Sequence, residues 1–513
     1  MLSNIKIVKA MRSIHKMGIV LLSLIILSFT YYKESKFYTV NKDGTLTFRP
    51  DEKGNIIPDF SRVGYHMGDK EIPDVKVVKT ISPASDGSSQ EIIQKAIDQV
   101  SAMKPDKDGF RGAILLKKGV YKIPGAITIK TSGIVLRGEG NDANGTKLIA
   151  TGKDRRVLVQ VSGEGAPREV KGTRTTVTED YVPVGRFYLE VEKPENFKVG
   201  DEIIIYRPGT DAWIKDLQMD KIIERPGTIQ WDAKSYNLTF ERAITAVKGN
   251  KIYINQPIVM PLEKKYGGAE VYKFTFAGRI QEVGVENILF ESEYASDTDE
   301  EHSWKAIEFD KIDNGWVRNV ISRYFATSCV NVDRYARYVT VTDSKCLDPK
   351  SVITGGRRYS FNVDGAFNLV KNCETTEGRH DYVSGARTMG PNVFYNCKAS
   401  NTHADIGPHH RWSAGALYDN IVTDGEINVH DRGNWGSGHG WVGTTQVLWN
   451  CTVKRAAVQT PWISGKNYCI GLVGQKYAGR LEGKPDGEWE SLGQHVNPQS
   501  LYIAQLKARK GNK

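Results

Sequence analysis

Short apolar runs, each closed by a glycine or a polar turn, recur along most of the chain. Soon after residue 110 they read AILLKKGVYKI, AITIKT and GIVLRGEG. Runs of this length, rich in β-branched residues and bounded by turn signals, are typical of strands. Just upstream, one segment has helical spacing instead, with Ser85 or Ser88 available as its N-cap. Its apolar positions are Ile92, Ile93, Ala96, Ile97 and Val100.

After Gly278 the strand-like runs become a repeat in which an asparagine follows an apolar segment. The asparagines are Asn287, Asn319, Asn372, Asn396, Asn420 and Asn450, at spacings of 32, 53, 24, 24 and 30 residues. The spacing of 53 is long enough for two coils, with YVTVT near Val341 as the rung that lacks asparagine. Coils of about 22 to 30 residues suit one turn of a parallel β-helix. We expect the asparagines to stack into a hydrogen-bonded ladder.

The regular succession of short apolar runs is interrupted between residues 161 and 275. The runs FKVGDEIIIYRPG and GNKIYINQPIV in this region predict antiparallel strands of an inserted β-rich subdomain, which could wall one side of a cleft. The last residues, 471–513, are polar and end in SLYIAQLKARK, a candidate capping helix. A solenoid needs such caps because its ends expose apolar core and unpaired strand edges.

The passage from the helix to the third strand resembles the start of pectate-lyase-like right-handed parallel β-helices. The matching positions are Gly112 to Val120, Tyr121, Ile127, Ile129, Ile134, Leu136, Gly138 and Gly140. The segments GRHDYV, GPNVF, GPHHRW, LYDN and GSGHGW resemble secreted bacterial β-helix proteins grouped with polysaccharide lyases, and the resemblance covers most of residues 85–510. It implies an all-β right-handed parallel β-helix that acts on a uronate polymer of the pectate, alginate or chondroitin type.

The expected organisation has six parts. They are a signal peptide or anchor (1–30), a lead-in and N-terminal cap (31–110), the first coils (111–160), the inserted subdomain (161–275), the main β-helix with an active-site groove (276–470) and a C-terminal tail and cap (471–513).

The N-terminus and the charge set the expected location and partner. Four basic residues precede the apolar run Met17 to Phe29, which is short for a membrane span and typical of a signal peptide, although an uncleaved anchor also fits. We expect a secreted, periplasmic or cell-surface monomer that meets a membrane only through this segment. The net charge of +10 suits an acidic partner. An acidic polysaccharide is favoured over nucleic acid, because the basic residues are spread out and the chain is exported.

The six cysteines all lie in the C-terminal half, without a CxxC motif or zinc-ribbon spacing. They fall in apolar, strand-like runs such as VKNCET and FYNCKA. We therefore expect buried thiols in the core and no disulfide framework.

Candidate chemistry concentrates between Gly378 and Trp441. Six of the ten histidines lie there: His380, His403, His409, His410, His430 and His439. Histidine is the side chain whose charge changes near neutral pH, so such a cluster favours proton transfer over a plain polar surface.

Stacking of coils should bring these residues together. Coils sit about 4.8 Å apart, so equal offsets from the ladder asparagines become neighbours in space. Arg387, Arg411 and Trp435 lie fifteen residues after their own asparagines and should form one stripe. A second stripe should hold His380, His403 or Asp405, and Asn428 or His430. Strand alternation lets only one of His409 and His410 face the groove. The glycine-rich run GNWGSGHGWVG should present His439, with Trp435 or Trp441 for sugar stacking.

These residue types suit β-elimination at a uronate, in which the C5 proton is removed and the 4-O substituent leaves. An arginine (Arg411, Arg387 or Arg432) would neutralise the carboxylate. His409 or His410 is the first choice of base and His380 the second, while Tyr382 or His439 would protonate the leaving oxygen. The expected substrate-binding residues are Arg387, Arg432, Trp412, Trp435, Trp441, His403, Asp405 and His302.

The scheme requires no cofactor and no metal, although Ca²⁺ is possible. The run DTDEEHSW supplies Asp297, Asp299, Glu300 and Glu301 as oxygen ligands but lacks the spacing of a defined site.

Three alternatives stay open. A glycoside hydrolase on the same fold would need paired carboxylates, for which Asp381, Asp405 and Asp431 are candidates. A glycan-binding protein without activity would explain the tryptophans and arginines but not the density of histidines. Zinc chemistry lacks an HExxH motif, and His403 with His409 or His410 is a loose match to ligand spacing. The excess of histidine and arginine favours elimination.

Overall fold

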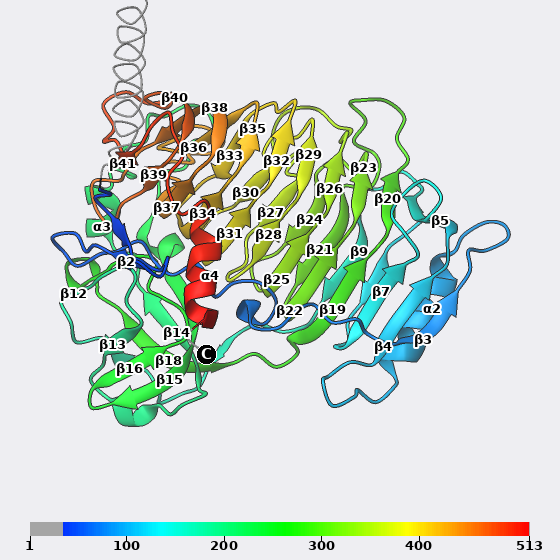
Figure 1. Ribbon diagram of the computed structural model, residues 1–513, viewed down its shortest axis with the longest axis horizontal. Coiled ribbons are helices and arrows are strands. Elements are labelled where there is room, and N and C mark those ends of the chain that lie inside the picture. Colours follow the sequence, from blue (N-terminus) through cyan, green and yellow to red (C-terminus); the bar gives the residue numbers. More distant parts are fainter. Residues whose placement is uncertain (1–33, 512–513) are drawn as a thin grey trace, which may run out of the picture.

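The computed structural model describes residues 34–511, whose main body is a parallel β-helix (Figure 1). The predicted signal peptide or anchor lies outside the described residues. Among residues 34–511, no helix is both long and apolar enough to cross a membrane.

Each coil of the helix contributes strands to three parallel faces. The first face is a sheet of twelve strands. In spatial order they are β3 (Val77–Ile81), β4 (Gly112–Leu116), β7 (Ile134–Gly138), β19 (Ile280–Glu286), β22 (Ile312–Arg318), β25 (Arg337–Thr342), β28 (Leu369–Lys371), β31 (Met389–Tyr395), β34 (Ser413–Asp419), β37 (Gly443–Trp449), β39 (Tyr468–Ile470) and β41 (Glu488–Glu490).

The second and third faces join through β38 (Thr452–Val458), which pairs with strands of both and makes them one sheet of eighteen strands. The second face holds β5 (Gly119–Ile123), β8 (Thr146–Ala150), β20 (Leu289–Ser292), β23 (Ile321–Arg323), β26 (Lys345–Leu347), β29 (Glu374–Thr376), β32 (Lys398–Ser400), β35 (Val422–Thr423) and β40 (Val473–Lys476). The third face holds β6 (Ile127–Ile129), β9 (Val157–Ser162), β21 (Lys305–Asp310), β24 (Ser328–Val332), β27 (Phe361–Val363), β30 (Tyr382–Ser384), β33 (Asp405–Pro408) and β36 (Glu426–Val429). The predicted fold class is confirmed.

In-register apolar side chains fill the interior of the coil. On the first face one such row runs through Val285, Val317, Val341, Val370, Phe394, Tyr418, Leu448 and Cys469. All eight side chains are at most 1 % exposed. All six cysteines are buried free thiols, as the apolar runs around them predicted.

The repeated asparagines turn the chain from the first face to the second. All six adopt left-handed backbone conformations, with φ between 50° and 60°. Asn319 Nδ2 donates to Asn287 Oδ1 at 2.8 Å, and Asn396 Nδ2 donates to Asn372 Oδ1 at 2.8 Å. Asp343 takes the rung that lacks asparagine and accepts from Asn372 at 3.1 Å. The predicted ladder is thus present over these coils.

The last two asparagines bind the C-terminal tail instead of one another. Asn420 Nδ2 donates to the Gln499 carbonyl and Asn450 Nδ2 to the Val496 carbonyl, both at 2.8 Å. The ladder ends there because the returning tail supplies the acceptors.

We expect Asn319→Ala to lower the free energy of unfolding by about 1–2 kcal/mol, because alanine loses the ladder bond and resists the left-handed conformation. Asn319→Gly tolerates that conformation and should lose less. Urea denaturation of both variants gives the two values. Equal losses would show that the backbone conformation contributes nothing.

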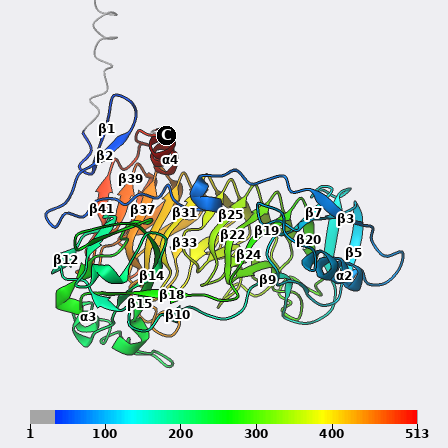
Figure 2. The same ribbon diagram turned by 90° about the horizontal axis from the view of Figure 1, so that it is seen from below.

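The inserted subdomain is antiparallel, unlike the coils on either side of it. Its main sheet holds β10 (Arg168–Glu169), β11 (Thr175–Thr176), β13 (Tyr188–Glu190), β14 (Glu202–Arg207), β15 (Leu238–Lys248), β16 (Lys251–Ile254) and β18 (Glu270–Thr275). A second small pair is β12 (Tyr181–Val182) with β17 (Leu262–Glu263), and α3 (Asp211–Asp216) lies between β14 and β15. Figure 2 shows the subdomain beside the C-terminal coils.

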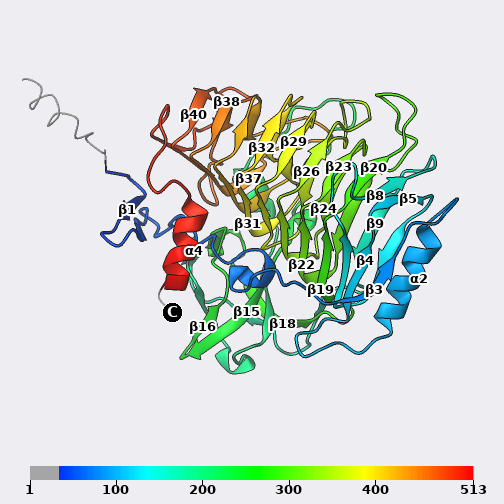
Figure 3. The ribbon, with the colours of Figure 1, turned by 45° about the vertical axis from the view of Figure 1, so that its right-hand side comes forward.

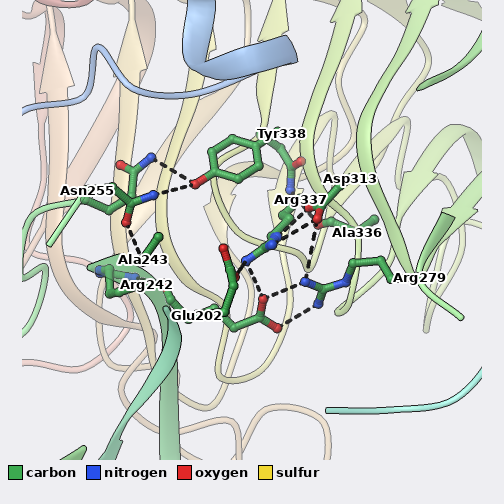
Figure 4. Close-up of polar contacts among 12 residues, drawn as sticks. Glu202, Arg242, Ala243, Asn255, Arg279, Asp313, Ala336, Arg337 and Tyr338 are labelled. Carbon is green, nitrogen blue, oxygen red and sulfur yellow. Dashed lines mark hydrogen bonds and ion pairs between the residues drawn. The ribbon is translucent and has the colours of Figure 1, made fainter. Parts of the chain in front are cut away.

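A network of half-buried charges links this subdomain to the first face (Figure 4). Arg279 binds both carboxylate oxygens of Glu241 at 2.8 Å. Arg337 on β25 donates to Glu202 at 2.8 Å and Glu241 at 2.9 Å, and it also pairs with Asp313 on β22. Burial opposes ionisation of Glu241, but Arg279 and Arg337 hold its pKa below the usual range. These contacts fix the subdomain on the coils next to the site.

Helices lie at two places on the β-helix. The first, α2 (Gln90–Ser101), packs its buried face on the first coils, as Figure 3 shows. Its N-cap is Ser89 and not Ser85 or Ser88; Ser88 Oγ accepts from the Gln90 amide instead. The helix predicted near the C-terminus is α4 (Leu501–Gly511). It packs on the outer side of the first face together with the N-terminal hairpin β1 (Tyr38–Val40) and β2 (Leu46–Phe48).

Candidate active site

A cavity of about 1140 Å³ opens beside the adjacent strands β33 and β36, whose Asp405, Glu426 and Asn428 contribute to its lining. The register sets part of this lining, because Asp405 pairs with Glu426. The cavity is lined by five of the six histidines between Gly378 and Trp441, namely His380, His409, His410, His430 and His439.

A chain of hydrogen bonds crosses the centre of this cavity. The Tyr359 hydroxyl lies 3.0 Å from Nε2 of His409, and Nδ1 of His409 lies 2.9 Å from Nδ1 of His410. The ring of His439 is 4.8 Å from that of His409 and 5.0 Å from that of His410. Tyrosine and two imidazoles therefore form one continuous path for protons.

A buried ion pair lies next to the histidines. Asp405 binds the guanidinium of Arg432, and its other carboxylate oxygen lies 3.1 Å from Nδ1 of His380. His380 Nδ1 also lies 2.7 Å from the Asp405 carbonyl. Burial opposes ionisation of Asp405, but the charge of Arg432 and the bond from His380 hold its pKa well below the usual range.

The cavity keeps its histidines neutral. Burial, reinforced by the charges of Arg411 and Arg432, lowers the pKa of His410 to about 4. Burial and the neighbouring His410 and Arg432 lower the pKa of His439 to about 3. Burial lowers the pKa of His409 and His380 as well and raises that of Tyr359. At neutral pH the imidazoles can accept protons and the phenol can donate one.

The inserted subdomain holds the glycine-rich loop that closes one side of the cavity. The Ile229 amide donates to the Ser437 carbonyl at 3.1 Å, and the Trp231 indole donates to the Gly438 carbonyl at 3.2 Å. Arg225 donates to the Gly436 carbonyl at 2.9 Å and lines the cavity itself. At Gly436 a side chain would collide with the ring of His439, so glycine is required there.

Positive charge dominates the lining. Its only carboxylates among residues 34–511 are Asp405 and Glu426, and each already pairs with an arginine. The arginines of the lining are Arg225, Arg379, Arg432, Arg455 and Arg480. Three of these arginines, Arg225, Arg379 and Arg480, form no ion pair with a carboxylate in the described part of the chain. Their free charges suit an anionic ligand.

Tyr382 lies inside the β-helix, not in the cavity. It is fully buried, and its hydroxyl donates to the carbonyls of Cys373 and Lys398, both at 2.8 Å. The expectation that it protonates the leaving oxygen is corrected, because the hydroxyl is turned into the core.

Trp412 and Trp441 are also fully buried, so the expectation that they bind sugar is corrected. The Trp412 ring lies 4.9 Å from Trp213 of the inserted subdomain, and Trp441 lies 5.5 Å from Trp462. Both also belong to the hydrophobic cluster of the inserted subdomain and pack that subdomain on the coils. Trp435, by contrast, lines the cavity and is 39 % exposed.

Two predicted histidines lie outside the cavity lining. The buried ring of His302 bonds the Ser292 hydroxyl at 2.9 Å and the Lys350 carbonyl at 2.9 Å, so it holds two loops together. His403 pairs with Glu377 at 2.7 Å. The expectation that His302 binds substrate is corrected because its ring is buried, whereas the role of His403, whose side chain is 30 % exposed, stays a prediction.

Arg387 and Arg411 lie on adjacent coils, as their equal offsets predicted, with a backbone bond of 3.1 Å between them. Neither belongs to the cavity lining. Arg411 donates to the Ser437 carbonyl at 2.9 Å and its hydroxyl at 2.7 Å, while Arg387 donates to the Ser235 carbonyl. We therefore reassign both from substrate contact to support of the loop and the subdomain boundary.

The acidic run upstream is occupied by protein partners. Asp297 pairs with Lys350, Glu300 with Arg357 and Glu301 with Arg155. Asp299 accepts the amides of Ala295 and Glu301 at 2.8 and 2.9 Å. Within residues 34–511 no group of three or more potential ligands is arranged to hold a metal ion.

Seven charged or tyrosine residues of the lining were missed from the sequence: Arg225, Tyr359, Arg379, Glu426, Arg455, Tyr477 and Arg480. Tyr359 lies two positions before Phe361, which pairs with Tyr382, just as His380 lies two positions before Tyr382. Extending the predicted row of residues that contains His380 by one coil towards the N-terminus would have identified Tyr359. The arginines follow no offset of the repeat.

We expect acid to destabilise the fold through the buried histidines. Burial and Arg432 lower the pKa of His430 to about 3, whereas the unfolded chain binds that proton near pH 6.5. Stability is therefore full above pH 6.5 and falls as the pH drops towards 3, by about 1.4 kcal/mol per pH unit for this residue. His430→Gln should show a correspondingly shallower slope in urea denaturation across this range. Identical slopes would contradict the prediction.

No family model matches the chain, and no curated protein matches its sequence. Solved structures with a similar fold include a tailspike protein of Pseudomonas phage LKA1 (13% identity, 79% of this chain and 74% of that one, TM-score 0.36). An alginate lyase from Paenibacillus (10%, 82% and 100%, TM-score 0.39) and the catalytic domain of a GH87 α-1,3-glucanase (11%, 84% and 68%, TM-score 0.37) are similar too. At these values the likeness says nothing about the reaction.

Proposed function

We propose that this protein is a polysaccharide lyase that cleaves a uronate-containing polymer by β-elimination. The observation that carries the proposal is the bonded chain Tyr359–His409–His410 inside an arginine-lined cavity. Elimination needs a neutral base, a protonated acid and cations that stabilise the charge developing on the carboxylate. The cavity offers all three, and the exported, acidic-polymer setting expected from the sequence suits the same reaction.

His410 is the proposed base, since its Nδ1 is held by His409 while Nε2 has no partner in the described part of the chain. Nε2 takes the C5 proton, the electrons of the C–H bond form the C4–C5 double bond, and the C4–O4 bond breaks. The leaving oxygen takes the phenolic proton of Tyr359. We assign stabilisation of the uronate carboxylate to Arg432, whose charge acts on all five cavity histidines.

His409 completes the cycle between these two groups. In the tautomer required, its Nε2 carries the proton towards Tyr359 and its Nδ1 accepts from His410. The phenolate regains a proton from His409, and His409 is resupplied by His410. This restores the phenol and leaves no net charge in the cavity, but both imidazoles are then in the opposite tautomer. Exchange of their protons with solvent returns His410 to the form with a bare Nε2 before the next turnover.

Hydrolysis is the second candidate, with Asp405 and Glu426 as the carboxylates, because they are paired in register on adjacent coils. A hydrolase needs one carboxylic acid with a raised pKa. Arg432 and His380 hold Asp405 ionised, and Glu426 is bound by Arg455. Asp381 has a pKa raised to about 6 by burial, but it does not line the cavity. Asp431 pairs with Lys484. Elimination is therefore favoured.

The test is to incubate the protein, produced from about residue 31, with pectate, alginate, glycosaminoglycans and ulvan, and to follow the ultraviolet absorbance of each mixture. Elimination leaves a conjugated C4–C5 double bond that absorbs, whereas hydrolysis leaves none. Rising absorbance with one polymer supports the proposal and names the substrate. New reducing ends without absorbance would assign the protein to the hydrolases, and silence in both assays would favour a binding protein.

A further inference from the structure

The C-terminal end of the cavity carries side chains that the elimination step does not use. We call His430, Trp435 and Arg480 the distal cluster; all three line the cavity. The guanidinium carbon of Arg480 lies 4.7 Å from the centre of the Trp435 ring. Arg480 also donates to the Arg432 carbonyl at 2.6 Å and to Asn434 Oδ1 at 2.8 Å. Its charge is thus held in place without a carboxylate partner among residues 34–511.

Within the distal cluster, His430 gives the strongest indication of a bound ligand. Its side chain is 1 % exposed, and neither ring nitrogen has a hydrogen-bond partner in the described part of the chain. Leaving a buried polar group unpaired costs about 1–3 kcal/mol. A Cβ at Gly479, where φ is +84°, would lie 2.9 Å from Nδ1 of His430, so only glycine leaves this ring its place. An imidazole without a hydrogen-bond partner at the wall of a cavity indicates that the ligand supplies the missing hydrogen bond.

The distal cluster lies one coil beyond the reacting residues. Asp405 and Ile406 pair with Glu426 and Ile427, and continuing this register sets His409 opposite His430. Adjacent coils are about 4.8 Å apart. That distance is comparable to the length of one sugar unit, so a chain lying along the β-helix axis places its next residue at the distal cluster.

We propose that His430 and Arg480 form a second anion-binding subsite, which takes the carboxylate or sulfate of the sugar next to the reacting uronate. Arg480 supplies the charge and His430 a ring N–H donor, while the exposed edge of Trp435 contacts the sugar. The substrate is then a polymer with acidic groups on consecutive residues. This inference rests on the proposed function for the position of the reacting uronate.

The experiment measures binding, so that it does not depend on turnover. Titration calorimetry is run on the Tyr359→Phe protein with four hexasaccharides. Galacturonate and mannuronate oligomers carry consecutive carboxylates, chondroitin sulfate adds a sulfate to the neighbouring residue, and hyaluronan leaves that residue neutral. Each ligand is tested with Arg480→Gln and His430→Gln added to the Tyr359→Phe protein. Arg155→Gln is the control, because Arg155 is half exposed and pairs with Glu301 outside the cavity.

We expect Arg480→Gln to weaken binding of a consecutively charged hexasaccharide about 10- to 100-fold, the range for a bond to a charged group, and His430→Gln to weaken it less. Hyaluronan binding and the Arg155→Gln protein should be unchanged. A loss confined to the uronate oligomers assigns the subsite to carboxylate, and one confined to chondroitin sulfate assigns it to sulfate. The subsite would be overturned if Arg480→Gln weakened hyaluronan binding equally, or if it weakened the binding of no ligand. It would also be overturned if no consecutively charged ligand bound at all.

The subsite and the proposed function fail separately. If no polymer gains absorbance but Arg480→Gln still discriminates between the ligands, elimination is wrong and the subsite stands. If absorbance rises with one polymer and Arg480→Gln binds every ligand like its parent, the lyase stands and the subsite is wrong. Unchanged thermal unfolding of each variant shows that the binding losses are local.

Discussion

Tyr359→Phe is expected to lower kcat by about 10²–10⁴-fold, the range for loss of a general acid. The phenol gives the leaving oxygen its proton, and phenylalanine keeps the ring while removing only the hydroxyl. The hydroxyl bonds the side chains of His409 and Arg379. Because each such bond contributes about 1 kcal/mol, stability should fall by no more than about 2 kcal/mol. Initial rates by absorbance and thermal unfolding measure the two effects.

Tyr324→Phe is the matched control for this substitution. Tyr324 lies against Tyr294, with ring centres 5.1 Å apart, and lines a different pocket. Its variant should keep full activity. A Tyr359→Phe protein that retains most of its kcat would remove Tyr359 from the acid role and leave His439 as the remaining candidate. Lost activity together with a large drop in thermal stability would mean that Tyr359 is structural.

The β-helix could be predicted because its signal is local and repeats. Each ladder asparagine marks the same turn of a coil, so Asn287 and Asn319 located strands that the structure places in register. The offsets from these asparagines also brought His380 and Asp405 together correctly, since stacking preserves position within the coil. The rung without asparagine was also predicted, at YVTVT near Val341, which the structure shows as β25 followed by Asp343.

Contacts between distant segments could not be predicted in this way. Trp412 and Trp441 resemble sugar platforms in the sequence, but the inserted subdomain covers both. Its residues precede these tryptophans by well over a hundred positions, and no repeat fixes where it packs. The same subdomain brings Arg225 to the cavity wall. The site is thus partly built by an element whose docking only the three-dimensional structure shows.

Loss of the Asp405 carboxylate should have the largest effect on stability. Asp405→Asn leaves the guanidinium of Arg432, 2 % exposed, without its counter-ion. Removing one partner of a buried ion pair costs about 3–5 kcal/mol, since the remaining charge stays buried and uncompensated. Urea denaturation at neutral pH measures this loss. Activity should fall as well, because the same carboxylate lies 3.1 Å from Nδ1 of His380, next to the reacting histidines.

Glu426→Gln tests whether burial is the cause. Glu426 lies on the adjacent coil and also pairs with an arginine, but the side chain of Arg455 is 44% exposed. An exposed pair contributes about 0–1 kcal/mol, so this variant should unfold almost like the parent protein. Replacing both members of the buried pair, in Asp405→Asn with Arg432→Met, removes the stranded charge and should recover part of the stability lost in the single variant. Two results would contradict this account: equal losses of stability in Asp405→Asn and Glu426→Gln, or no recovery in the double variant. Either result would show that packing, and not the buried ion pair, stabilises this region.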